Sequence, residues 1–100
     1  MPDTQATEST ISEREIRQKV LHNLQPHYAI DLLELSRLRS RLHGSRDASS
    51  DEYRDLRTFN GMAISRLGRS SRNKLIRLVL SYFDFTDPQS FETKLTDQLL

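Results

Sequence analysis

The sequence predicts a compact all-α bundle of about five short helices in one domain. Its 100 residues are the usual size of one domain with one core, and 35% of them are hydrophobic. Only three glycines and three prolines interrupt the chain, which favours helices over a strand-rich or loop-rich fold. Apolar residues recur at three- and four-residue spacing along most of the chain, which is typical of amphipathic helices.

The first helix begins after a polar N-terminal segment. Residues 1–10 have no apolar periodicity and predict a flexible tail, so the domain is expected to span 11–100. Ser12 is the expected N-cap because Glu15 follows three residues later, which is the pattern of a capping box. Pro26 is expected to end the helix. Its buried side is predicted to carry the residues at spacing four, Ile16, Val20 and Leu24.

The second predicted helix runs from Tyr28 to His43 and ends at Gly44. Its apolar face is formed by residues at three- and four-residue spacing: Tyr28, Leu32, Leu35, Leu38 and Leu42. The small and polar residues of the segment 43–50 predict a loop.

The third helix is expected to follow a second capping box, formed by Ser49 and Glu52. Its apolar residues keep helical register well past its middle: Tyr53, Leu56, Phe59, Ala63 and Leu67. The pair Asn60-Gly61 lies within this register and is also a strong hairpin-turn signal. The register favours a continuous helix, and a break at this pair stays open.

Two further helices complete the predicted bundle. Gly68 is expected to end the third helix in a left-handed conformation, and Ser70 or Ser71 to cap the fourth helix. Asp87 before Pro88 predicts the N-cap and first turn of the last helix. The apolar faces are predicted to carry Leu75, Ile76, Val79, Leu80 and Phe83 on the fourth helix and Phe91, Leu95 and Leu99 on the last.

The residues that catalysis or metal binding needs are poorly represented. The chain has no cysteine, and its three histidines (His22, His27 and His43) lack the spacing that places two metal ligands on one helix face. No segment has the glycine spacing of a nucleotide-binding loop. We therefore expect no enzyme, no metal and no cofactor. Apolar runs are too short to cross a bilayer and no signal-peptide pattern is present, so a cytoplasmic protein is expected.

The charges are distributed unevenly along the chain. The net charge is only +1, yet residues 37–77 carry eleven basic against four acidic side chains, while the segments 1–36 and 78–100 each have a net charge of −3. No acidic residue occurs between Leu56 and Phe83. Twelve of the fifteen basic residues are arginines, whose planar guanidinium suits phosphate. A basic middle between acidic ends predicts a polyanionic partner.

The segment from Arg66 to Lys74 is the strongest candidate for a phosphate site. Backbone N–H groups at the start of a helix lack intrahelical partners and carry its partial positive charge, so a phosphate is expected to meet them there. The alternative is that Gly68 and the following serines only end one helix and cap the next. The residues predicted to contact nucleic acid are Arg37, Arg39, Arg41, Arg46, Arg57, Arg66, Arg69, Ser70, Ser71, Arg72, Lys74 and Arg77. Three aromatic residues, Phe59, Tyr82 and Phe83, fit the core better than a base-stacking role.

One alternative for this segment is a sequence-specific DNA-binding regulator. The string from Ala63 to Ser70 (AISRLGRS) looks like a helix-turn-helix, in which the fourth helix would read the major groove. Such motifs usually bury an aliphatic residue six positions after the glycine, where this chain has Lys74. The strongly apolar run from Leu75 onward also resembles a core helix more than an exposed recognition helix.

A second resemblance rests on the length, the helix count, the lack of catalytic residues and two blocks, 52–57 (EYRDLR) and 65–72 (SRLGRSSR). In these features the chain resembles the small subunits of CRISPR effector complexes, in particular the all-helical subunits of type I Cascade, including type I-D. The resemblance implies several copies packed along a guide-RNA complex beside other protein subunits, with arginines that steady the target duplex or the displaced strand. A third hypothesis is a protein–protein adaptor without nucleic-acid contact, in which acidic ends and basic middles of successive copies attract each other.

Overall fold

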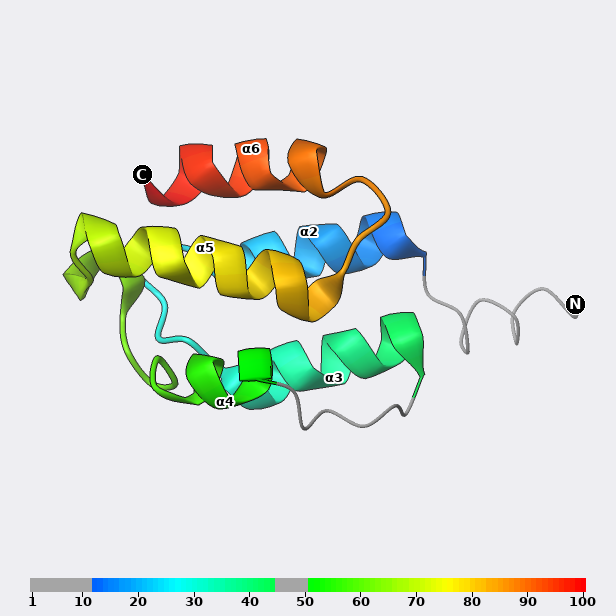
Figure 1. The fold of residues 1–100 in the computed structure, drawn as a ribbon, viewed down its shortest axis with the longest axis horizontal. Coiled ribbons are helices and arrows are strands. Elements are labelled where there is room, and N and C mark those ends of the chain that lie inside the picture. The colour runs from blue at the N-terminus through cyan, green and yellow to red at the C-terminus, as the bar shows by residue number, and fades with distance from the viewer. Residues whose placement is uncertain (1–11, 45–50) are drawn as a thin grey trace, which may run out of the picture.

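The structure is a computed structural model that describes residues 12–44 and 51–100. Within these ranges the chain forms five α-helices and one 3-10 turn, and it forms no β-strand beyond a single isolated bridge. In chain order these are α2 (Glu13–Asn23), α3 (Leu32–His43), α4 (Asp51–Arg57), η1 (Ile64–Arg66), α5 (Arg69–Phe83) and α6 (Pro88–Leu99) (Figure 1). The predicted all-α bundle is confirmed. None of these helices is long and apolar enough to cross a membrane.

The central element is α5, which packs against α3, α4 and α6, while α2 packs against α3 (Figure 1). Its inward side chains are buried, among them Leu75 and Val79 with no exposed surface. Phe59, Tyr82 and Phe83 are buried as well, which confirms the predicted core role over base stacking. Every buried side chain in the described residues is apolar or aromatic, so hydrophobic burial is the main source of stability.

The predicted caps of α2 and α6 are confirmed. The Ser12 hydroxyl accepts a hydrogen bond from the Glu15 backbone N–H at 3.2 Å, and the Asp87 carboxylate accepts one from the Ser90 N–H at 3.4 Å. Both bonds satisfy first-turn donors that have no partner inside the helix. The expected tail 1–10, the cap Ser49 and the segment 45–50 lie outside the described residues.

The start of α3 differs from the prediction. The helix begins at Leu32 with Asp31 as its N-cap, four residues later than expected, and the Asp31 carboxylate accepts from the Glu34 N–H. Tyr28 therefore lies outside the helix and is exposed. The residues before Asp31 do not continue the helix because the backbone N–H of Ile30 donates to the carbonyl of Met62 at 2.9 Å.

The predicted third helix is shorter than its apolar register suggested. α4 ends at Arg57, and a turn follows in which Gly61 has a φ of +83°, a conformation that side chains other than glycine rarely adopt. The Asn60 side-chain carbonyl accepts from the Leu32 N–H at 2.8 Å, and the Gly61 N–H donates to the Ile30 carbonyl at 2.7 Å. These bonds to a distant segment compensate for the lost helical bonds. The continuous helix that we favoured to Leu67 is wrong.

The role predicted for Gly68 is also wrong. Its φ of −72° is not left-handed, and it is the N-cap of α5 rather than the end of the preceding helix. α5 therefore begins at Arg69, and Ser70 and Ser71 lie in its first turn instead of capping it.

A single carboxylate joins α2 to the turn between α5 and α6. Glu13 Oε2 accepts hydrogen bonds from the backbone N–H of Thr86 at 3.0 Å and from its hydroxyl at 2.9 Å, and it forms an ion pair with Arg17 at 2.8 Å. Burial by itself would raise the pKa of Glu13, but these three donors outweigh burial and hold the pKa below its ordinary value.

Replacement of Glu13 by Gln is expected to make the free energy of unfolding less dependent on pH. A carboxyl whose pKa is lower in the folded state adds stability above its unfolded pKa and loses it as the pH falls through the folded pKa. Wild type should therefore exceed Glu13→Gln in stability at neutral pH, and the difference should shrink on acidification below the ordinary carboxyl range. Urea unfolding of both proteins, from neutral pH to below the ordinary carboxyl range, measures this difference in the free energy of unfolding. A constant difference would contradict the role of the ionised carboxylate.

Candidate nucleic-acid interface

Two of the predicted phosphate ligands, Arg39 and Arg72, use their donors inside the bundle. Arg39 Nε donates to the backbone carbonyl of Tyr82 at 2.8 Å, and the guanidinium lies 5.0 Å from the centre of the Tyr82 ring. Arg72 Nε donates to the Leu67 carbonyl at 3.0 Å and Arg72 Nη1 to the Leu99 carbonyl at 3.1 Å. Both side chains are partly buried and hold helices together, which leaves little of either for a ligand.

The outer side of α5 keeps a different set of the predicted residues together. Ser70, Lys74 and Arg77 are exposed and follow one another at spacings of four and three, so they lie on one side of the helix. Arg66, the last residue of η1, and Arg69, the first residue of α5, are exposed as well. We call these five residues the α5 cationic face: Arg66, Arg69, Ser70, Lys74 and Arg77. Ser71 lies off this face and is half-buried.

In the part of the chain that the structure describes, no carboxylate compensates the charge of the α5 cationic face. Within residues 12–44 and 51–100, none of its four cations forms an ion pair with a carboxylate. At its N-terminal end, Gly68 offers no side chain to accept from the first-turn N–H groups of α5. The positive end of the helix dipole therefore adds to the field of the side chains. This arrangement attracts anions and leaves the cations free to bind them.

The arginines of α3 lie on a separate surface. Arg37 and Arg41 are exposed and stand two residues before and after Arg39, which reaches α5. At about 100° per residue, both point to the side of α3 that faces away from α5. Arg37 also lies 3.5 Å from the Glu34 carboxylate. The cationic middle of the sequence is therefore divided between two sides of the bundle.

Two further predicted residues stand apart from both surfaces. Arg57, at the end of α4, lines a shallow hollow with Leu33, Tyr53 and Asn60. Arg46 lies outside the described residues.

The fold also gathers cations that sequence reasoning missed. Arg14 and Arg17 of α2 and Lys94 of α6 line a hollow of about 420 Å³ whose walls include Leu21 and Phe91 but no carboxylate. Arg17 is partly committed, since it pairs with Glu13 and its guanidinium lies 5.3 Å from the Phe85 ring centre. These residues come from the two acidic ends of the chain, so only the packing of α2 against α6 brings them together.

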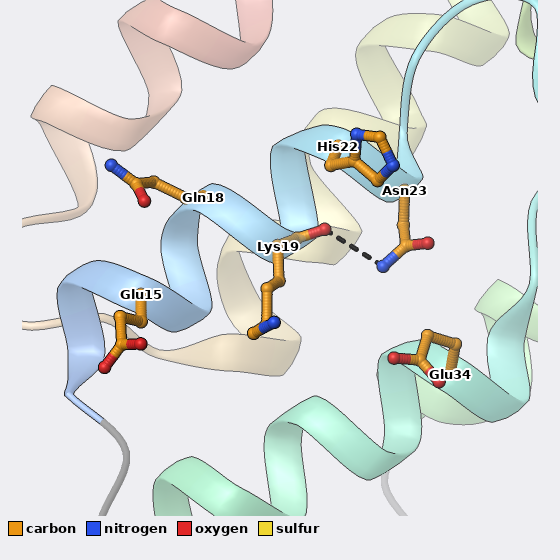
Figure 2. Close-up of a pocket in the computed structure, with 6 residues that line it drawn as sticks. All are labelled: Glu15, Gln18, Lys19, His22, Asn23 and Glu34. Carbon is orange, nitrogen blue, oxygen red and sulfur yellow. Dashed lines mark hydrogen bonds between the residues drawn. The ribbon is translucent and has the colours of Figure 1, made fainter.

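The hollow between α2 and α3 has a different character (Figure 2). It has a volume of about 400 Å³ and is lined by Glu15, Gln18, Lys19, His22, Asn23 and Glu34. Two carboxylates against one ammonium make it unfavourable for a phosphate. Across the described ranges, no three His, Asp or Glu side chains lie close enough together to hold a metal ion.

The structure does not support a helix-turn-helix at Ala63–Ser70. α4 ends at Arg57, and eleven residues separate it from α5, whereas the motif joins two helices by a turn of three or four residues. The buried Leu67 lies in the turn between η1 and α5, and α5 is the central helix of the bundle rather than an exposed recognition helix.

Comparison of the chain with protein-family models, with curated proteins and with solved structures finds no match. The function is therefore inferred from the chemistry and geometry of the residues themselves.

Proposed function

We propose that this domain binds the phosphate backbone of a nucleic acid through the α5 cationic face and that it performs no catalysis. The observation that carries the proposal is the set of four exposed cations on one side and at the N-terminal end of α5, none of them paired with a carboxylate of the described residues. Because such contacts go to phosphates rather than to base edges, they give affinity without reading sequence.

The rigidity of α5 supports this proposal. A helix packed against three others holds its outer side chains at fixed intervals along an axis, at about 1.5 Å per residue. Arg69, Lys74 and Arg77 are therefore spread over about 12 Å along α5, and Arg66 of η1 lies before its first turn, so the cations can contact successive phosphates of a strand that runs along the helix. The resemblance to small subunits of CRISPR Cascade complexes stays a prediction. It would make this chain a helical protein that binds a nucleic-acid backbone beside other subunits in the cytoplasm, which is compatible with the proposed function.

Reversal of the two outer charges of α5, Lys74→Glu with Arg77→Glu, is expected to weaken binding of single- and double-stranded DNA. Removal of two phosphate contacts should reduce the slope of log K against log salt concentration by about 1.4 to 1.8. Fluorescence anisotropy across a salt series measures both the affinity and the slope, and circular dichroism checks that the helices persist.

The matched control is Arg37→Glu with Arg41→Glu, which changes the net charge by the same amount on the outer side of α3. If the proposal holds, this variant keeps most of the affinity and the salt slope. Equal loss in both variants would mean that net charge alone governs binding and would overturn the assignment to α5. If wild type binds neither DNA nor RNA at low salt, the adaptor hypothesis replaces the proposed function.

A further inference from the structure

Two loops at one end of the bundle are joined by backbone hydrogen bonds. The connection between α2 and α3 pairs with the segment after α4 through Ile30 N–H to the Met62 carbonyl at 2.9 Å and Ser65 N–H to the Pro26 carbonyl at 2.8 Å. An isolated antiparallel bridge joins Ala29 to Ala63 between these bonds. In Figure 1 this end lies at the left, where α5 begins. The two loops are therefore fixed to each other, and the side chains of both project from one joined segment.

The two joined loops present an exposed aromatic ring. All seven Phe and Tyr residues of the chain lie in the described ranges, and Tyr28, with 44% of its surface exposed, is the most exposed of them. The His22 ring meets Tyr28 edge-on, with 5.6 Å between ring centres, and is itself held by Gln25 at 3.2 Å. Met62, 42% exposed, lies on the partner loop. Tyr28 is thus held by its neighbours with part of its ring open to solvent.

The backbone bonds between the two loops also bring the first residue of the α5 cationic face close in the fold to the loop that carries Tyr28. Ser65 is bonded to Pro26, which is two residues from Tyr28, and Arg66 directly follows Ser65. Arg69 follows three residues later as the first residue of α5, after the extended residues Leu67 and Gly68. An exposed aromatic ring and arginines on two joined segments match the two parts of an unpaired nucleotide, a base with a π-face and a phosphate with a negative charge.

We propose that the ligand is a single-stranded nucleic acid and that one unpaired base stacks on Tyr28 while Arg66 and Arg69 hold the neighbouring phosphates. This inference rests on the proposed function and adds to it the class of ligand. A base within a duplex is already stacked on both faces, so only an unpaired base gains from the ring. Stacking tolerates any base, which agrees with binding that does not read sequence.

The test compares an oligothymidylate with an abasic oligonucleotide of the same length, which has the same phosphates but no bases. Tyr28→Ala should weaken binding of the oligothymidylate by about tenfold and leave binding of the abasic strand unchanged. Tyr28→Phe keeps the ring and should bind like wild type. An oligouridylate in parallel distinguishes RNA from DNA as the source of the strand, and circular dichroism of each variant checks the fold.

The outcomes separate the two proposals. If Tyr28→Ala binds both strands like wild type while the double reversal of Lys74 and Arg77 weakens both, the stacking inference falls and backbone binding stands. Equal weakening of both strands by Tyr28→Ala would mean that the residue supports the loops and would also overturn the inference. Absence of binding by wild type to any strand would overturn both proposals.

Discussion

Val79→Asp is expected to unfold the domain at neutral pH. Val79 has no exposed surface and lies in the middle of α5, the helix that contacts α3, α4 and α6. The substitution removes about 1.5 to 3 kcal/mol of hydrophobic burial, and an unpaired buried carboxylate adds about 3 to 5 kcal/mol. A domain of this size has a total stability of only about 5 to 15 kcal/mol. The loss is thus comparable with the whole, and far-ultraviolet circular dichroism should show little helix and no cooperative melt.

Ser81→Asp is the matched control for this substitution. It introduces the same carboxylate two residues further along α5, at an exposed position. Its effect on the free energy of unfolding should stay within about 0.5 kcal/mol, as is usual for surface changes. A Val79→Asp protein that melts like wild type would show that α5 does not bury this side and would contradict the core described above.

The positions of the core residues follow from local spacing and were therefore predictable. Residues three and four apart share a helix side wherever the chain is helical, so the apolar positions of α5 and α6 identified the buried side chains directly. The caps Ser12 and Asp87 were predictable for the same reason, because the residues that form each cap are three apart in the sequence.

The breaks in the helices depended on contacts that the sequence does not display locally. Asn60 and Gly61 bond to Leu32 and Ile30, which are about thirty residues away, and these bonds favour the turn over a continued helix. The apolar residues before and after the break are still buried, since Phe59 and Leu67 both lie in the core. Apolar spacing thus predicted burial correctly where it predicted secondary structure wrongly.

The candidate site was predictable only in part, because its geometry also depends on how the helices pack. Charge density along the chain located a cationic segment, but it did not separate arginines that serve the fold from those on the outer side. For Arg72 the separating signal was present, because it stands three, four and seven residues before Leu75, Ile76 and Val79, on the buried side of α5. The hollow with Arg14, Arg17 and Lys94 had no such signal, since it depends on how two distant helices pack.

Arg72→Met is expected to destabilise the domain while leaving the α5 cationic face intact. The methionine keeps most of the apolar stem but has no donor for the carbonyls of Leu67 and Leu99. The Leu99 carbonyl ends α6, where it has no partner within its own helix and where a positive charge favours the negative end of the dipole. Loss of charged hydrogen bonds of this kind costs about 2 kcal/mol, which lowers the Tm of a domain this small by roughly 10 °C.

Arg69→Met is the comparison variant for Arg72→Met. Arg69 lies three residues earlier on α5, is exposed and belongs to the α5 cationic face, so its loss should change the Tm by no more than about 3 °C and should weaken nucleic-acid binding. Arg72→Met should lower the Tm more than Arg69→Met does. At a temperature where both proteins are folded, it should weaken nucleic-acid binding less. Thermal melts and anisotropy titrations of the two variants separate the roles, because each removes one arginine and the same charge. Equal melting temperatures of the two variants would show that Arg72 does not stabilise the end of α6. Equal losses of binding would show that Arg72 contacts the nucleic acid, as the charge pattern first predicted.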